Sequence, residues 1–204
     1  MEEAKIEVIK RWLGTGSINL FGRPFSGKDT QAGILSKLLN APIIGGGEII
    51  RNSQNAAVKD IVGKGSLAPT QAYLDMVLPY FAQQEFAGGP LILSSVGKWS
   101  GEEKSIIAAL KESNHPLMAV VYLDFSEDQV LKRWKAAQDL GDRGSRADDD
   151  RHALDVRFEE FRNKTLPVVD FYRQQGLLIE IDGDQPLDKV TEEILEALLS
   201  RAAA

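Results

Sequence analysis

The sequence has no cysteine, few histidines and no long apolar run, and each shortage excludes a class of protein. Without cysteine, the 204-residue chain forms neither disulfides nor thiolate metal sites. Its two histidines, His115 and His152, are far apart, so we expect no structural metal centre. No apolar segment approaches the roughly 20 residues that span a bilayer, and the charged N-terminal segment does not resemble an export signal. We therefore expect a cytoplasmic protein without a membrane partner.

The composition is that of an ordinary globular domain. Hydrophobic residues make up 43% of the chain and charged residues 26%, which excludes the disordered and fibrous classes. A chain of 204 residues suits one domain with a sizeable core. The net charge of −6 argues against broad nucleic-acid binding, although local cations can still bind a small anion. We expect a monomer whose ligands are small molecules.

Short β-rich runs alternate with helical segments along the chain. The five runs are Ser17–Gly22, Pro42–Gly46, Pro90–Val96, Ala119–Phe125 and Leu177–Asp182. Several are continuously apolar, which is typical of strands covered on both faces. The alternation predicts an α/β fold of three layers, with a five-stranded parallel sheet and helices on both faces.

Two stretches interrupt this alternation. Glu48–Gly89 is too long for a simple crossover and carries helical patterns near Glu48–Val62 and Gln71–Phe86, with Thr70 as an expected N-cap. Asp139–Asp150 is polar and contains glycine, which indicates a surface loop. The expected organisation is one domain with a core at 1–46, 90–138 and 151–204, a helical insertion at 47–89 and a short lid at 139–150.

The first run leads into a glycine-rich segment, Gly22-Arg-Pro-Phe-Ser-Gly27-Lys28, followed by an expected helix at Thr30–Leu39. Successive backbone N–H groups and the positive end of a helix dipole together bind phosphate. Gly22 and Gly27 permit the close backbone approach that side chains would obstruct, and Lys28 can reach the β- and γ-phosphates of a nucleotide. The segment predicts a fold of the P-loop NTPase type that binds ATP.

Asp29 departs from the general P-loop pattern, in which a Ser or Thr that touches Mg²⁺ occupies this position. Thr30 follows and could supply a hydroxyl group. Asp29 could favour the helix N-terminus electrostatically, or it could help to hold a hydrated Mg²⁺. The sequence leaves both roles open, and we expect the metal to arrive with the nucleotide rather than in a ligand set of the protein.

The segment GRPFSGKDTQ resembles the P-loop of the adenylate kinase family, G-x-P-G-S-G-K-G-T-Q, and differs from it at Phe25 and Asp29. The resemblance continues in the family's order from about residue 17 to residue 198. Gly47–Arg51 is similar to G-D-x-L-R, Gly65–Pro69 to G-x-L-V-P, Pro90–Lys98 to F-I-L-D-G-F-P-R, Gly144–Asp149 to G-R-x-D-D, and Gly176–Gly183 to the final strand.

The resemblance implies a nucleoside monophosphate kinase, which transfers the γ-phosphate of ATP, with Mg²⁺, to an acceptor such as AMP. Guanidinium groups suit this chemistry because they are always charged and bind phosphate oxygens in a bidentate manner. The implied catalytic residues are Lys28, Arg146 and Arg157. The implied ATP-binding residues are Gly22, Pro24, Ser26, Gly27, Lys28, Asp29, Thr30 and Arg133. The implied monophosphate-binding residues are Gly46, Arg51, Ser95, Lys98, Glu102, Arg146 and Arg157, with Asp148 and Asp149 orienting the lid arginines.

Some residues depart from the family at positions that it uses. Ser94 replaces an aspartate associated with Mg²⁺, Lys98 replaces an arginine, Ser95 replaces a glycine beside the acceptor base, and Ala137, expected on a packing face, replaces a second arginine. Glu102 replaces a glutamine that reads adenine. A carboxylate accepts hydrogen bonds but cannot donate them, so it suits guanine better. The alternative is an exposed glutamate that begins a surface helix, and GMP and pyrimidine monophosphates stay open beside AMP.

Two other functions are compatible with a P-loop. A small-molecule kinase of the shikimate or gluconate type fits poorly with the long insertion and the lid arginines. A nucleotide-binding protein with little catalysis is favoured by Ser94 and Ala137, and is opposed by Lys28, Arg146 and Arg157.

Overall fold

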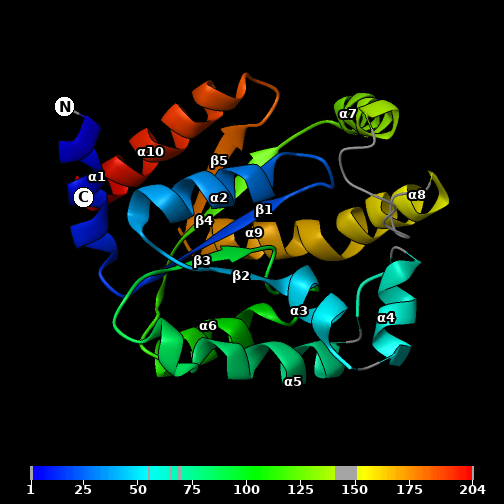
Figure 1. Cartoon of the computed structure of the whole chain (residues 1–204), viewed down its shortest axis with the longest axis horizontal. Helices are drawn as coiled ribbons and strands as arrows, with labels where there is room; N and C mark the ends of the chain where they lie inside the picture. Colours follow the sequence, from blue (N-terminus) through cyan, green and yellow to red (C-terminus); the bar gives the residue numbers. More distant parts are fainter. Residues whose placement is uncertain (1, 55, 65, 69, 141–150, 204) are drawn as a thin grey trace.

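The computed structural model describes residues 2–54, 56–64, 66–68, 70–140 and 151–203. Its centre is one parallel sheet in the order β2-β3-β1-β4-β5 (Figure 1). The strands are β1 (Ser17–Gly22), β2 (Ile43–Gly45), β3 (Leu91–Ser94), β4 (Leu117–Asp124) and β5 (Leu178–Asp182). The predicted α/β fold with a five-stranded parallel sheet is confirmed, and the strand bounds agree with the expected runs to within two residues.

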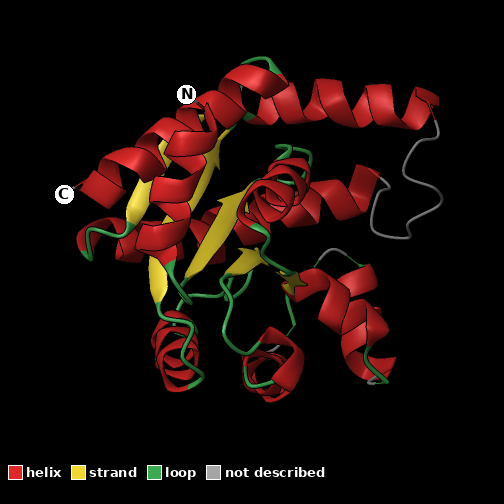
Figure 2. Ribbon diagram, turned by 60° about the vertical axis from the view of Figure 1, so that its left-hand side comes forward, coloured by secondary structure: helices red, strands yellow, loops and turns green. Residues whose placement is uncertain are grey.

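Helices cover both faces of the sheet (Figure 2). One face packs against α1 (Glu2–Leu13), α2 (Lys28–Leu39) and α10 (Leu187–Ala203), and the other against α5 (Thr70–Phe81), α6 (Glu103–Glu112) and α9 (Leu166–Gln174). Neighbouring residues of a strand point to opposite faces, so Leu20 joins the first core and Phe21 the second. The central strands β1, β3 and β4 are buried on both faces and are mostly apolar, whereas the edge strand β5 alternates buried and exposed positions.

The insertion after β2 consists of α3 (Gly46–Asn52), α4 (Ala56–Gly63), α5 and a 3₁₀ turn, η1 (Gln84–Phe86). The single helix expected over Glu48–Val62 is wrong, because the chain breaks after Asn52. Ser53 adopts extended angles (φ −64°, ψ 158°) and caps α3 with a hydrogen bond from its N–H to the Ile50 carbonyl. Asn52 and Ser53 at this point are residues that favour turns over helix interiors.

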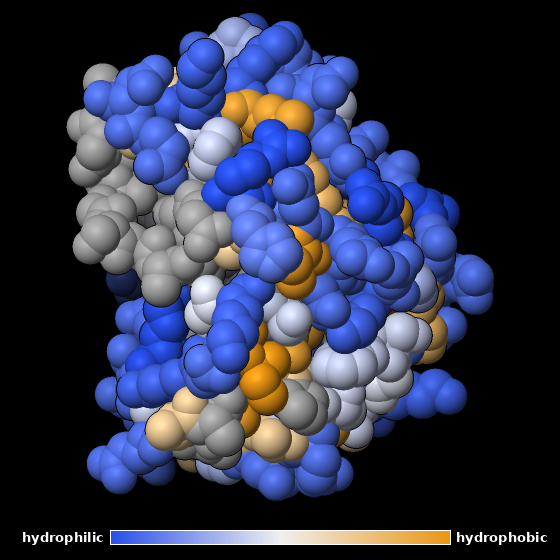
Figure 3. Space-filling view, turned by 90° about the vertical axis from the view of Figure 1, so that its right-hand side faces the viewer, coloured by the Kyte–Doolittle hydropathy of each residue, from blue (hydrophilic) through white to orange (hydrophobic). Residues whose placement is uncertain are grey.

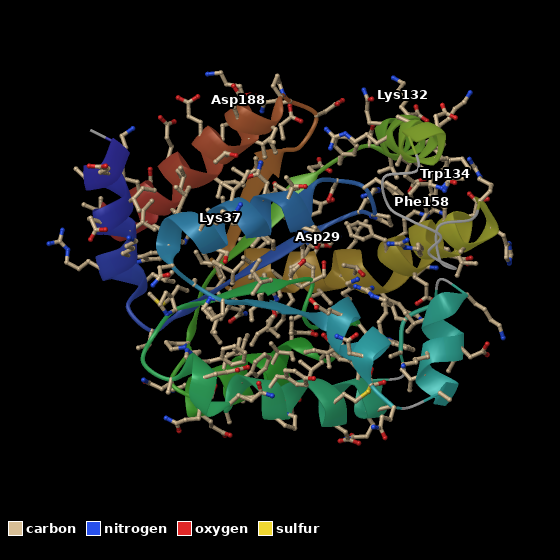
Figure 4. The ribbon with its side chains drawn as sticks, in the orientation of Figure 1. Asp29, Lys37, Lys132, Trp134, Phe158 and Asp188 are labelled. Carbon is tan, nitrogen blue, oxygen red and sulfur yellow. The ribbon has the colours of Figure 1, made fainter. Side chains whose placement is uncertain are left out.

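Two further helices stand over the carboxyl ends of the strands. These are α7 (Glu127–Leu140) and α8 (Arg151–Glu160), and Trp134 and Phe158 pack between them with Phe125 and Val130 (Figure 4). Helix α8 continues through a π-helical turn, η3 (Phe161–Thr165), into α9. Pro167 explains the widened turn, since its ring cannot donate a hydrogen bond and crowds the preceding carbonyl groups.

The surface at the end of the molecule that carries α4, α7 and α8 is largely hydrophilic (Figure 3). Among the described residues, the large hydrophobic side chains that are exposed are Ile43 (40%) and Leu187 (53%). In the same part of the chain, every helix is too short or too polar to cross a lipid bilayer.

Candidate active site

The glycine-rich loop connects the end of β1 to the start of α2, as the motif predicts. Gly27 has a positive φ of 87°, and a Cβ atom at Gly22 would lie 2.5 Å from the Ser26 hydroxyl oxygen, so both positions need glycine. Phe25 also has a positive φ, 61°, which costs a non-glycine residue about 1–2 kcal/mol. The loop is therefore held in a wound conformation with the N-terminus of α2 directed at the space beyond the strands.

A cavity of about 670 Å³ lies in front of this loop. It is bounded by the start of α2, the end of β3, helix α3 of the insertion, and helices α7 and α8. Asp29 points into this region in Figure 4. The cavity brings together the predicted residues Gly27, Lys28, Asp29, Thr30, Arg51, Ser95, Lys98, Arg133 and Arg157. A volume of this size accommodates a small-molecule ligand.

Four basic residues from four segments surround the cavity. Burial lowers the pKa of Lys98, and the positive charges of Lys28, Arg157 and Arg51 lower it as well. The negative charge of Asp29 opposes them only in part, and the resulting pKa is about 7. Lys98 keeps partial contact with the water of the cavity, which moderates this effect. Like charges gathered in this way repel one another, and an anion placed between them removes the repulsion. The cluster is therefore an anion site beside the phosphate loop.

Asp29 introduces a negative charge at the edge of this cluster. Its Oδ1 atom accepts a 2.6 Å hydrogen bond from the Ser94 hydroxyl, and Lys28 Nζ lies 3.3 Å from Oδ2. Burial alone would raise the pKa of Asp29, but Lys28 and the Ser94 hydrogen bond outweigh it and hold the pKa well below its ordinary value. The side chain is 64% exposed to the cavity and stays ionised.

An ionised carboxylate in a polyphosphate site repels the ligand unless a cation lies between them. The fixed Asp29 carboxylate and the neighbouring Thr30 therefore fit a hydrated Mg²⁺ that accompanies a nucleotide. Groups of three or more His, Asp or Glu side chains able to hold a metal do not occur among the described residues. The metal would thus depend on the nucleotide for most of its ligands.

Arg133 on α7 forms one side wall of the cavity. Its guanidinium lies 4.0 Å above the centre of the Phe125 ring and donates to the carbonyl oxygens of Phe25 and Gly183, each at 3.4 Å. Burial lowers its pKa. The expectation that Ala137 lies on the packing face of this helix is wrong, because Ala137 lines the cavity one turn from Arg133. The missing second arginine would have projected into the same space.

A narrower region extends from the large cavity towards the insertion. Gly46 and Glu102 line its inner part, and Gly22 and Pro24 line its connection to the phosphate loop. Gly47, Ser95 and Lys98 line the large cavity and both narrower ones. The three spaces are therefore compartments of one site.

Two residues that the sequence did not single out hold the segment that carries Ser95 and Lys98. The Asn19 side chain on β1 donates to the Val96 carbonyl (2.8 Å) and accepts from the Val96 N–H (3.3 Å). Tyr73 on α5 accepts a 2.9 Å hydrogen bond from the Gly97 N–H. Asn19 is a fully buried polar residue between the apolar residues Ile18 and Leu20 of β1, and this is the signal that could have identified it.

Glu102 is buried, with 2% of its surface exposed, so its interpretation as an exposed helix residue is wrong. Its Oε2 atom accepts a 3.1 Å hydrogen bond from the Trp99 N–H, and the Thr70 side chain donates to the same carboxyl group. Burial raises the pKa of Glu102 to about 7, more than these two hydrogen bonds lower it. The group is therefore close to half-protonated at neutral pH.

The predicted residues fall into three groups. Most of the predicted residues line the connected cavities, including those described in the phosphate loop and the monophosphate-binding set, and Arg133. Ser26 is buried within the loop, and its hydroxyl has no hydrogen-bond partner among the described residues. Arg146, Asp148 and Asp149 lie outside the described residues.

Comparisons with known proteins find similar sequences over most of the chain. The family model described as adenylate kinase matches residues 20–177. A protein of Xylella fastidiosa named adenylate kinase is 31% identical over 186 residues, which cover 88% of this chain and 97% of that protein. Similar proteins of the same name come from Leptospira biflexa (28% identity, 87% and 96% covered) and Methanocella arvoryzae (27% identity, 88% and 96% covered).

Proposed function

The chain belongs to the adenylate kinase family and is a nucleoside monophosphate kinase, and from this premise we propose that it transfers the γ-phosphate of Mg²⁺-bound ATP to AMP. The observation that carries the proposal is the group of cations formed by Lys28, Arg51, Lys98 and Arg157 across the central cavity. They come from opposite sides of the space, as the two phosphate chains of a donor and an acceptor require.

Each cation has a separate task in this proposal. Lys28 and the loop that contains Gly22, Pro24, Ser26 and Gly27 hold the β- and γ-phosphates of ATP. Arg51 and Lys98 hold the acceptor phosphate. Arg157, together with Arg146 from the proposed lid, neutralises charge on the phosphoryl group during transfer. Phosphoryl transfer needs mainly this alignment and charge stabilisation, since the protein does little covalent work.

The remaining expectations complete the proposal. Arg133 borders the ATP base, Asp148 and Asp149 orient the lid arginines, and residues 47–89 and 139–150 move over the core 1–46, 90–138 and 151–204. The Asp29 carboxylate, held by Ser94, would hold Mg²⁺ through water, with Thr30 as a second oxygen donor. The ion would supply positive charge that neutralises the charge developing on the phosphates.

A coupled assay with Mg²⁺-ATP and a panel of AMP, GMP, CMP and UMP tests the proposal. We expect ADP formation that depends on AMP and is strongest with it. The Lys28→Ala variant removes the phosphate ligand, and Lys37→Ala is a matched control, because this exposed lysine lies at the far end of the same helix (Figure 4). Nucleotide binding without turnover of any monophosphate would instead favour a protein that binds nucleotides and does little catalysis.

We also propose that the protein acts as a monomer. The exposed large hydrophobic residues among those described, Ile43 and Leu187, are few and lie on different elements, β2 and α10. Stable interfaces need a contiguous area of about 800 Å² per partner. Light scattering at micromolar concentration is expected to give one chain per particle, and a mass that doubles with concentration would contradict this.

A further inference from the structure

Two buried polar side chains line the inner compartment of the acceptor site. Glu102 is 2% exposed and Ser95 is 4% exposed, and both residues line the cavity that Gly46 and Tyr73 also line. The Ser95 hydroxyl has no hydrogen-bond partner among the described residues. A buried polar group without a partner is costly, and such groups in native proteins usually have a functional explanation. A ligand in this compartment would supply the missing partner.

The Glu102 carboxyl group is fixed in position but is not neutralised. The Trp99 N–H and the Thr70 side chain orient it, while among the described residues no cation forms an ion pair with it. A carboxylate has about four acceptor positions, so two bonds leave others for a ligand. Its proton is therefore not displaced by a fixed positive partner and can come and go near neutral pH.

The groups around Glu102 divide into those that titrate and those that do not near neutral pH. Glu103, on the same helix, raises the pKa of Glu102, whereas Lys98, in the preceding segment, lowers it. Burial raises the pKa of Tyr73 on α5 and of Tyr172 on α9, so both phenols stay neutral. Among the lining residues of this compartment, Glu102 and Lys98 each have a pKa of about 7, so both change charge between pH 6 and pH 8.

We propose that Glu102 and Ser95 read the hydrogen-bonding edge of the acceptor base, and that one proton on Glu102 switches the preference between adenine and guanine. The inference rests on the proposed function, in which Lys98, a lining residue of this compartment, holds the acceptor phosphate. A neutral carboxyl group donates through O–H and accepts through C=O, which matches N1 and N6–H of adenine. An ionised carboxylate only accepts, which matches N1–H and N2–H of guanine.

Ser95 is compatible with both bases. Its hydroxyl can accept from an adenine amino group or donate to the guanine carbonyl oxygen, because a hydroxyl group has both capacities. Val62 and Leu67 of the insertion line the same compartment, so a base that binds there would also contact apolar side chains.

The decisive measurement is the ratio of kcat/KM for AMP to kcat/KM for GMP between pH 6 and pH 8. A ratio cancels the titration of Lys98 and of the nucleotide phosphate, because these affect both acceptors alike. With half-protonation near pH 7, the neutral form falls about tenfold over this range and the ionised form rises about tenfold. We therefore expect the ratio to fall by up to about 100-fold.

Two variants separate base reading from a structural role. Glu102→Gln always donates and accepts, so its ratio is expected to stay at the acidic, AMP-preferring value at every pH. Glu103→Gln is the matched control, because this neighbouring carboxylate accepts from the Gly101 N–H (2.6 Å) and does not line the compartment. Its ratio is expected to keep a pH dependence of the same size with a midpoint at lower pH, because the charge that raises the pKa of Glu102 is lost.

Calorimetry on the wild-type protein tests the same idea without a variant. At pH 7, titrations in two buffers of different ionisation enthalpy are expected to show about one proton more taken up with AMP than with GMP. Turnover of both nucleotides with a ratio that does not change with pH would overturn the inference and leave the kinase intact. Equal proton uptake for both nucleotides would overturn it equally. Turnover of neither nucleotide at any pH would overturn the proposed function, and this inference with it.

Discussion

Replacing Glu102 by glutamine should change how the stability of the free protein depends on pH. The folded protein raises the pKa of this carboxyl group from 4.5 to about 7, mainly through burial. The folded state thus binds a proton that the unfolded state has already released. The stability associated with that proton is fully present below pH 4.5 and is lost as the pH rises through about 7.

The magnitude follows from the size of this shift. Raising the pKa from 4.5 to about 7 corresponds to about 3 kcal/mol when complete, since a tenfold change in an equilibrium constant corresponds to about 1.36 kcal/mol. Between pH 5 and pH 8 the free energy of unfolding should fall by about 2.5 kcal/mol through this group. The change is smaller than the full amount because the carboxyl group of the unfolded chain is already partly ionised at pH 5. Glutamine cannot ionise, and its carbonyl oxygen can still accept from the Trp99 N–H.

Urea unfolding at pH 5 and pH 8 measures the effect. Glu102→Gln is expected to be about as stable as the wild type at pH 5 and about 2–3 kcal/mol more stable at pH 8. Glu112→Gln, an exposed carboxylate in the last turn of the same helix, should change stability by no more than about 0.5 kcal/mol at either pH. An equal difference between Glu102→Gln and the wild type at both pH values would refute the reasoning, because it would mean that Glu102 is ionised in the folded protein throughout.

Three further substitutions probe the site. Lys28→Ala should lower kcat by at least about 100-fold, as loss of a preorganised ligand of the transferred charge does, and wild-type turnover in steady-state assays would contradict the role of the loop. Asp29→Asn should tighten binding of Mg²⁺-free ATP by about fivefold and reduce the gain in affinity that Mg²⁺ gives, because it removes about 1 kcal/mol of repulsion between the carboxylate and the phosphates. Calorimetry with and without Mg²⁺ tests this. Asp188→Asn on α10 (Figure 4) should change neither of these affinities. Gly46→Ala should destabilise the protein by about 1–3 kcal/mol in thermal unfolding. Its Cβ would lie 2.6 Å from the Tyr73 hydroxyl oxygen and 2.7 Å from the Ser95 carbonyl oxygen. Gly33→Ala, which has open space around it, should instead stabilise α2 by about 0.5–1 kcal/mol.

The sheet and the phosphate loop could be predicted because local chemistry determines them. A strand that is buried on both faces is apolar at most of its positions, so the bounds of Ser17–Gly22 were predicted to the residue. Gly22 and Gly27 are dictated by space and by a left-handed backbone within the loop itself. In such segments the neighbours along the chain carry most of the information.

Features that depend on distant segments could not be predicted in this way. Glu102 follows a glycine at the start of an amphipathic helix, as many exposed glutamates do, and its burial comes from Thr70, Tyr73 and the rest of α5 packed above it. Ala137 likewise lies on the same helical face as Val130 and Trp134 of α7. Those two residues pack against the core, whereas Ala137 lines the cavity. Helical periodicity gives the face of a residue but not what lies opposite that face.

The shared walls of the three compartments limit how the protein can be re-engineered. Because Gly47, Ser95 and Lys98 border all of them, a substitution there alters the surroundings of both nucleotides together. In the proposed function, selectivity for a new acceptor is more readily obtained at Glu102, and selectivity for a new donor at Arg133 or Ala137, since each of these borders one compartment alone. Redesign of either specificity should therefore begin at residues that line one compartment and leave the three shared lining residues unchanged.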